Sequence, residues 1–221
     1  MEFVLDTADI NAIKELDEVL TIAGVTTNPT IITKSGKQPE QVIAELVDYL
    51  RPDQSLFIQS VATDYEGILE EARYINGLRP ENTYVKIPVT RDGMKAIKAA
   101  NAEGLNVLAT AIYSADEAFL AALNGADYVA PYVNRMCNYG DGVAQVIDLI
   151  QMFAVQGIST KIIAASFKSV EQVHELIAAG IQAVTVQPDV VRNMLDHPGT
   201  EIAVNEFTEA WDAAYGRTTL R

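Results

Sequence analysis

Residues 82–90 read Asn-Thr-Tyr-Val-Lys-Ile-Pro-Val-Thr, and a lysine, Lys86, stands inside this otherwise apolar run. Tyr84, Val85 and Ile87 are the aromatic and β-branched residues that a pleated, buried surface accepts. A strand this apolar is typical of a parallel sheet covered on both faces. An ammonium group in such a place is costly unless it is paired or loses its proton. The stretch therefore predicts a buried parallel strand and makes Lys86 a candidate functional residue.

The rest of the chain repeats this pattern, with a short apolar run followed by a longer amphipathic one. Ile10, Ile13 and Leu16, for example, are spaced as on one face of a helix. We expect strands at residues 3–6, 23–27, 56–61, 84–89, 106–112, 127–133, 161–166 and 183–188. Three residue pairs match the capping box that begins a helix: Thr63 with Glu66, Ser114 with Glu117, and Ser169 with Gln172.

About eight repeats of strand and helix indicate a parallel sheet with right-handed crossovers. The predicted fold is α/β, a (β/α)8 TIM barrel over residues 1–200, because closure leaves no sheet edge. The rival, a doubly wound open sheet for dinucleotides, usually has a glycine-rich turn after its first strand. Here that strand ends in Leu-Asp-Thr-Ala-Asp, without glycine. An extra C-terminal helix and tail are expected at residues 201–221.

Composition limits the classes of partner. The 221 residues carry a formal net charge of −14, so we expect a soluble protein that repels nucleic acid and anionic membranes. Hydrophobic residues make up 49% of the chain, enough for a large core, yet no run of about 18 apolar residues predicts a membrane span. The acidic start of the chain does not match a secretory signal, so a cytoplasmic protein is expected.

Cysteine and histidine are too sparse for several kinds of site. The single Cys137 excludes an internal disulfide, and we interpret it as a small hydrophobic filler. His174 and His197 are the only histidines and belong to no cluster of metal ligands. We therefore expect no metal and no cofactor.

Polar side chains recur at the carboxyl ends of the predicted strands, where the chemistry of a barrel is located. They are Asp6, Thr26, Asn28, Gln59, Lys86, Thr110, Tyr132, Asn134, Arg135, Ser166 and Gln187. Thr26 and Asn28 could equally serve a local turn, and Tyr132 could be a core aromatic residue with a satisfied hydroxyl.

Lys86 has a specific chemical interpretation. Burial can lower the pKa of a lysine from its ordinary value of about 10.4 by several units. The neutral amine is then a nucleophile toward carbonyl groups, and the protonated imine that forms allows a carbon–carbon bond to break. This is aldol chemistry without a metal. The alternative is an ion pair with Asp6, which is compatible with that role.

Six segments carry a resemblance to a known family: "LDTAD", "GVTTNPTII", "VKIPVT", "TAIYSADEA", "GADYVAPYVNR" and "KIIAASFKS". In this order, and over essentially the whole chain, they resemble the small transaldolase family. The resemblance implies that Lys86 forms the Schiff base and that Asp6 and Asn28 hold donor hydroxyls. It implies further contacts from Thr26 and Thr110, and a phosphate site at Arg135 and Ser166.

Gln59 and Tyr132 decide between two branches of that family. Its transaldolases carry a glutamate and a phenylalanine at these positions. Glutamine cannot exchange a proton near neutral pH, whereas a tyrosine hydroxyl can. The pair therefore resembles the aldolase branch, with Tyr132 as acid and base and with Gln59 and Thr110 positioning a water. The implied reaction is reversible cleavage of fructose 6-phosphate to dihydroxyacetone and glyceraldehyde 3-phosphate.

Two other functions remain open at the level of sequence. One is a transaldolase that passes the dihydroxyacetone unit to an aldose phosphate. The other is a barrel that binds sugar phosphates without turnover. Gln187 departs from the apolar residue expected in the aldolase branch, and this change at the rim bears on the choice of donor and on the chain length of the acceptor.

The tail has an apolar stripe of its own, formed by Ala203, Phe207, Ala210, Trp211 and Ala214. It could pack on its own barrel. The resemblance implies instead that it packs on a neighbouring subunit in a homo-oligomer, a decamer of two pentameric rings.

Overall fold

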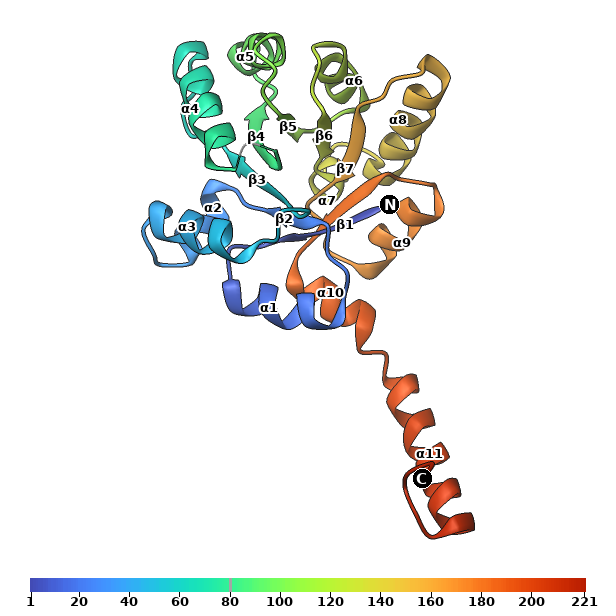
Figure 1. The fold of residues 1–221 in the computed structure, drawn as a ribbon. Coiled ribbons are helices and arrows are strands. Elements are labelled where there is room, and N and C mark those ends of the chain that lie inside the picture. Colours follow the sequence, from blue (N-terminus) through green and yellow to red (C-terminus); the bar gives the residue numbers. More distant parts are fainter. Residues whose placement is uncertain (80) are drawn as a thin grey trace.

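The computed structural model describes residues 1–79 and 81–221, and eight parallel strands close into a barrel with helices around it (Figure 1). The strands are β1 (Glu2–Asp6), β2 (Gly24–Thr26), β3 (Ser55–Gln59), β4 (Thr83–Pro88), β5 (Val107–Ile112), β6 (Tyr128–Pro131), β7 (Lys161–Ala164) and β8 (Ala183–Val186). They follow one another in chain order, and β8 pairs with β1. The predicted (β/α)8 TIM barrel is confirmed.

Helices follow each strand and cover the outside of the barrel (Figure 1). They are α1 (Ile10–Val19), α2 (Pro29–Lys34), α3 (Pro39–Tyr49), α4 (Tyr65–Leu78), α5 (Arg91–Ala102), α6 (Ala115–Leu123), α7 (Val133–Met136), α8 (Gly142–Gln156), α9 (Val170–Ala178) and α10 (Pro188–Leu195). A last helix, α11 (Pro198–Tyr215), follows at the C-terminus.

Helix capping follows the sequence with one exception. Ser114 and Ser169 cap α6 and α9, as the capping boxes predict. The prediction of Thr63 as the cap of α4 is wrong. Asp64 caps that helix instead, since its Oδ1 accepts the N–H of Gly67 at 2.9 Å.

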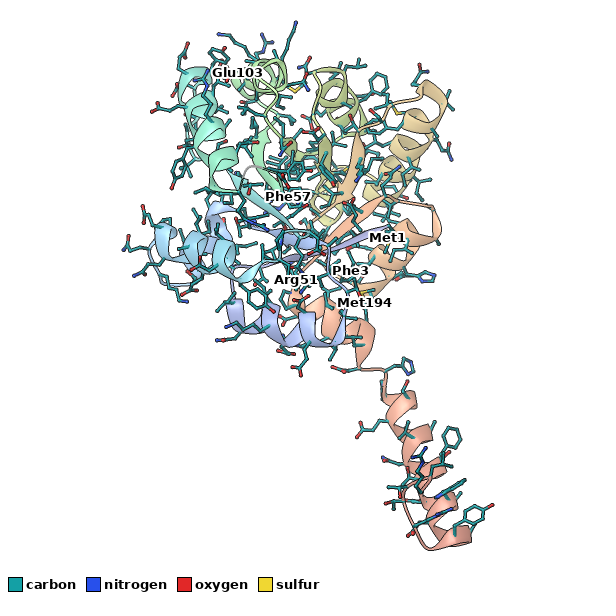
Figure 2. All side chains as sticks on the ribbon, viewed as in Figure 1. Met1, Phe3, Arg51, Phe57, Glu103 and Met194 are labelled. Carbon is teal, nitrogen blue, oxygen red and sulfur yellow. The ribbon has the colours of Figure 1, made fainter. Side chains whose placement is uncertain are left out.

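Apolar side chains form two layers on either side of the sheet. Phe57, which is labelled in Figure 2, fills the interior of the barrel together with Leu108 and Ile163. Its ring stacks on that of Tyr84, with 4.9 Å between the ring centroids. A larger layer lies between the sheet and the helices and includes Val85. This alternation follows from the period of two in a strand, and it turns Tyr84 and Lys86 inward on β4.

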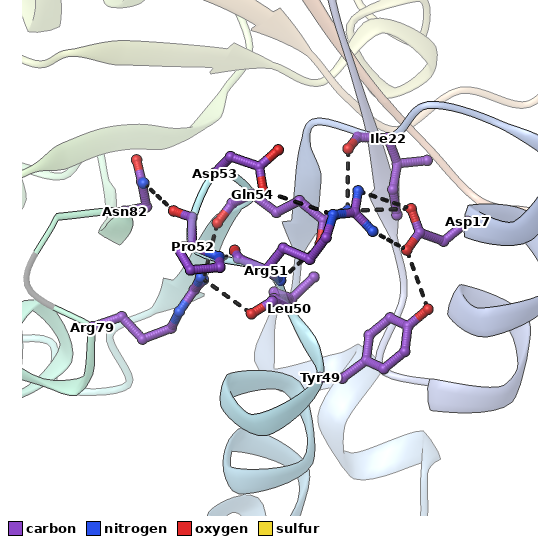
Figure 3. A network of polar contacts seen from close by, with 10 residues as sticks. All are labelled: Asp17, Ile22, Tyr49, Leu50, Arg51, Pro52, Asp53, Gln54, Arg79 and Asn82. Carbon is purple, nitrogen blue, oxygen red and sulfur yellow. Dashed lines mark hydrogen bonds and ion pairs between the residues drawn. The ribbon is translucent and has the colours of Figure 1, made fainter.

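Polar contacts tie together the chain segments that lead into β2, β3 and β4 (Figure 3). The carboxylate of Asp17 accepts hydrogen bonds from Tyr49, Arg51 and Gln54, the last two at 2.7 and 3.2 Å. Arg79 donates to the carbonyl groups around the same turn, including that of Gln54 at 3.0 Å. These contacts lie at the start of the strands, so they stabilise the barrel away from its mouth.

The C-terminal helix α11 projects from the barrel (Figure 1), and none of its residues is buried. The structure does not pack the tail on its own barrel, which was one of the two alternatives. The interpretation of Cys137 as a buried filler is also wrong, because that residue is exposed at the end of the short helix α7. Among the described residues, no helix is long and apolar enough to span a membrane.

Candidate active site

Lys86 lies at the carboxyl end of β4 and is 4% exposed. Its Nζ donates a hydrogen bond of 2.8 Å to the backbone carbonyl of Thr27. Burial lowers the pKa of the Lys86 ammonium below its ordinary value, while the negative charge of Asp6 acts in the opposite direction. The amine therefore loses its proton more readily than that of an exposed lysine.

Asp6 ends β1 beside this amine, at the same rim of the barrel. Burial raises the pKa of the Asp6 carboxyl, against the opposing effects of Lys86, Thr26 and Arg135. Its Oδ1 accepts the hydroxyl of Thr26 at 2.8 Å, and the Thr26 oxygen lies 2.6 Å from that of Thr185. Asp6 and Lys86 form none of the ion pairs found in residues 1–79 and 81–221. Each group is instead held by a neutral partner.

Tyr132 follows β6 and directs its hydroxyl toward Thr110 on β5, with 3.1 Å between the two oxygens. Burial raises the pKa of the Tyr132 hydroxyl, while Thr110, Arg135 and the backbone of Ala111 lower it. The phenol is therefore protonated at neutral pH. It can donate a proton and take it back, as a general acid and base must.

Arg135 lies on α7, one turn from Tyr132. Its guanidinium carbon is 4.9 Å from the centroid of the Tyr132 ring, and Nη1 donates to the Tyr113 hydroxyl at 3.3 Å. Ser166 follows β7 in the left-handed region, with φ of 62°, and its carbonyl accepts the N–H of Asn134. The ends of β6 and β7 are thus joined, and Arg135 presents a positive charge at the mouth of an acidic protein.

Three polar residues of the rim stand in different settings. The Asn28 side chain caps α2, since its Oδ1 accepts the N–H of Ile31 at 2.9 Å. Gln59 ends β3 in register with Lys86 and is half-buried. Gln187 begins α10, and its side chain makes no hydrogen bond to that helix. Asn28 therefore serves the local turn through its Oδ1 atom. This contact leaves the two N–H donors of its amide group available.

Sequence reasoning missed three residues of this site. Thr185 contacts Thr26, and its inward position could have been found by counting back two residues from Gln187. Thr27 acts through its backbone carbonyl, for which a side chain gives no signal. Tyr113 holds Arg135 from the loop after β5.

The arrangement brings together a buried amine, a phenol and a cation. Lys86, Asp6, Thr26, Thr110, Tyr132 and Arg135 are linked by the hydrogen bonds and charge effects above. A desolvated amine can condense with a carbonyl compound, and a phenol nearby can move the protons. The part of the chain that the structure describes has no cluster of three or more His, Cys, Asp or Glu residues placed to share a metal ion.

Two solved structures are similar to this chain. One belongs to a "cube-shaped, highly porous protein cage designed by fusing symmetric oligomeric domains" and is 16% identical, with a TM-score of 0.57 over 97% of this chain and 78% of that one. The other, described as "Native KDPGal structure", is 18% identical, with a TM-score of 0.55 over 83% of this chain and 80% of that one. Both likenesses concern the fold alone.

A comparison of sequence with protein families carries more weight. The profile of the family described as "Transaldolase/Fructose-6-phosphate aldolase" matches residues 3–219, nearly the whole chain. With the barrel and the buried lysine at its mouth, this match identifies the protein as a member of the transaldolase/fructose-6-phosphate aldolase family.

Proposed function

We propose that the protein is a class I aldolase that reversibly cleaves fructose 6-phosphate to dihydroxyacetone and glyceraldehyde 3-phosphate. The observation that supports this most is the burial of the Lys86 amine at the barrel mouth, where its pKa is lowered. A module that only binds sugars gains nothing from a desolvated amine, which costs stability. Since the proposed substrates are phosphorylated and do not cross membranes freely, we expect the enzyme to act in the cytoplasm.

Cleavage begins when the neutral amine of Lys86 adds to C2 of the open-chain ketose. Tyr132 then gives its proton to the leaving hydroxyl, so that water departs and a protonated imine and a phenolate remain. The C4 hydroxyl then gives its proton to the phenolate of Tyr132, either directly or through a water held by Gln59 and Thr110. The C3–C4 bond breaks, its electron pair moves into the enamine, and glyceraldehyde 3-phosphate departs. Tyr132 returns the proton to C3, and hydrolysis of the imine releases dihydroxyacetone.

Charge and hydrogen bonding suggest where the substrate lies. Arg135 and Ser166 are proposed to hold the phosphate, because an Arg fork suits a phosphate group. Asp6, Thr26 and Asn28 are proposed to hold the hydroxyls of the donor. The phosphate and the donor end would then lie on opposite sides of the imine carbon.

The pair of Gln59 and Tyr132 favours the aldolase over a transaldolase. An amide has no exchangeable acid near neutral pH, whereas the Tyr132 hydroxyl already contacts Thr110. An assay separates the two reactions. The proposed aldolase releases free dihydroxyacetone from fructose 6-phosphate alone, whereas a transaldolase requires an aldose phosphate acceptor before it turns over.

Assembly forms a further part of the proposal. We propose that residues 201–221 pack on a neighbouring subunit of a homo-oligomer, a decamer of two pentameric rings. The support is that α11 buries no residue on its own barrel. Exposed apolar side chains on one stretch of chain are typical of an interaction surface.

Borohydride trapping tests the chemistry directly. Incubation with fructose 6-phosphate and borohydride should add the mass of the reduced imine to the peptide that contains Lys86. Lys86→Met should show no adduct and no turnover. If the wild-type protein bound the sugar phosphate without forming an adduct, it would be a binding barrel, and turnover by Lys86→Met would rule out both enzyme functions.

A further inference from the structure

A cavity of about 600 Å³ opens beside Asp6. Its wall is formed by the segment that follows β1, by α2 with the loop after it, and by the start of α10. Arg135 follows β6, which stands across the closed barrel from β2. The cavity therefore lies on the side of the mouth away from the proposed phosphate site.

Gln187 stands in this wall with Asp6. Along β8, Ala183 fills the barrel interior and Thr185 contacts Thr26 there, so the period of two turns Gln187 to the same side. The backbone carbonyl of Gln187 accepts the N–H of Val190, but its amide side chain makes none of the hydrogen bonds found among the described residues. The amide is half-buried and available to a ligand.

The cavity wall carries three cations, Lys34, Lys37 and Arg192, and three carboxylates, Asp6, Asp9 and Asp189, so that its formal charges balance. Lys37 is paired with Glu45 at 2.6 Å, and Arg192 is paired with Glu15 at 2.8 Å. Arg192 also contacts Asp189. Two of the three cations are paired and the formal charges of the wall cancel, so the cavity suits a neutral, hydroxylated group better than a second phosphate.

Asp6 lines the cavity and lies near Lys86, and this indicates which end of the substrate meets the cavity. In a ketose phosphate, the phosphate would be held at Arg135 and the carbonyl carbon would react at Lys86. The end that remains is the short carbon chain on the other side of the carbonyl, which takes no part in the cleavage. Resting on the proposed function, we propose that the cavity is a subsite for this end. It admits neutral hydroxyketone donors one hydroxymethyl group longer than dihydroxyacetone, and the Gln187 amide is the specificity-determining residue.

Hydrogen–deuterium exchange of the donor tests this without an acceptor. Imine formation at Lys86 allows the carbon beside the carbonyl to lose a proton and regain a deuteron in D2O, which NMR detects. Erythrulose and 1-hydroxybutan-2-one have the same chain length, and only erythrulose has hydroxyls at the far end. The ratio of their exchange rates should fall about tenfold in Gln187→Met, the effect of one hydrogen bond of ordinary strength.

Gln151→Met is the matched control, because Gln151 is exposed on α8 outside the barrel. It should leave the ratio unchanged. The proposal would be overturned if Gln187→Met left the ratio of the two exchange rates unchanged. It would also be overturned if the wild-type protein exchanged 1-hydroxybutan-2-one but not erythrulose. Failure of the imine chemistry on which the proposed function depends looks different, because hydroxyacetone, which needs no cavity, would then not exchange either.

Discussion

Lys86 is held by a carbonyl group and not by a carboxylate, and this choice of partner sets its chemistry. A carboxylate in contact would stabilise the ammonium form, whereas the Thr27 carbonyl gives the amine a fixed direction with a weaker charge effect. Asp6 stands close enough to raise the pKa of Lys86 but is engaged by Thr26. The strand pattern predicted a buried lysine. It could not predict that Lys86 bonds to Thr27 while Asp6 bonds to Thr26, because these neighbours are distant in the sequence.

The pH dependence of imine trapping follows from these pKa shifts. The trapped fraction should rise with pH as Lys86 loses its proton and reach its plateau below the ordinary lysine pKa of about 10.4. Asp6→Asn should move the profile to lower pH, because the carboxylate that raises the pKa of Lys86 is gone. Mass spectrometry of the borohydride adduct at saturating dihydroxyacetone measures both. A shift to higher pH would contradict the assigned charge effect.

The same burial predicts a stability cost at Lys86. Its pKa is lower in the folded than in the unfolded state, so between the two values the unfolded chain binds more protons and stability rises with pH. Lys86→Met removes this penalty. We expect the stability of Lys86→Met relative to the wild type to be greatest near neutral pH and to fall as the pH approaches about 10.4. Denaturant unfolding between neutral pH and about pH 10 measures the difference in unfolding free energy between the variant and the wild type. An increase of this difference with pH would contradict the prediction.

Among the elements, β5 shows which feature of a strand the sequence does not predict. Its span of residues 106–112 was predicted almost correctly, but its register against β6 shifts between Ala109 and Ile112. Ala109 packs outward and Thr110 inward, and Ile112 is again outward, so Ala111 is the extra residue of a bulge, with φ of 56°. Alanine gives no sequence signal for a positive φ, and the bulge could not be foreseen.

This bulge places Thr110 and the Ala111 backbone at the Tyr132 hydroxyl. A β-branched residue at positive φ is strongly disfavoured, so Ala111→Val should displace both groups. We expect turnover to fall about tenfold or more, a loss typical of a misplaced general acid. Trapping of dihydroxyacetone at Lys86, on β4, should persist. Ala111→Gly accepts the same backbone and should keep turnover close to the wild type, and equal activity of the Val and Gly variants would contradict this role.

At the scale of the whole molecule, closure of the barrel was predictable and the position of the tail was not. Eight strand–helix repeats without a glycine-rich first turn left the closed sheet as the economical solution, and β1 pairs with β8 as that requires. The rim residues followed from the same topology, because parallel strands all end on one side. The apolar stripe of α11 identifies a surface to be covered but does not specify what covers it.

The lone Trp211 makes the proposed covering of α11 measurable. Phe207 lies on the same face of that helix and is 71% exposed. If the stripe packs on a neighbouring subunit, Phe207→Glu should reduce the mass in solution to that of a monomer and shift Trp211 emission to longer wavelength. Asn205→Glu adds the same charge to the opposite face of α11 and should leave both unchanged.

Deleting residues 198–221 should also give a monomer, since α11 buries nothing on its own barrel. A wild-type chain that is already monomeric at micromolar concentration would show that the stripe has no such partner.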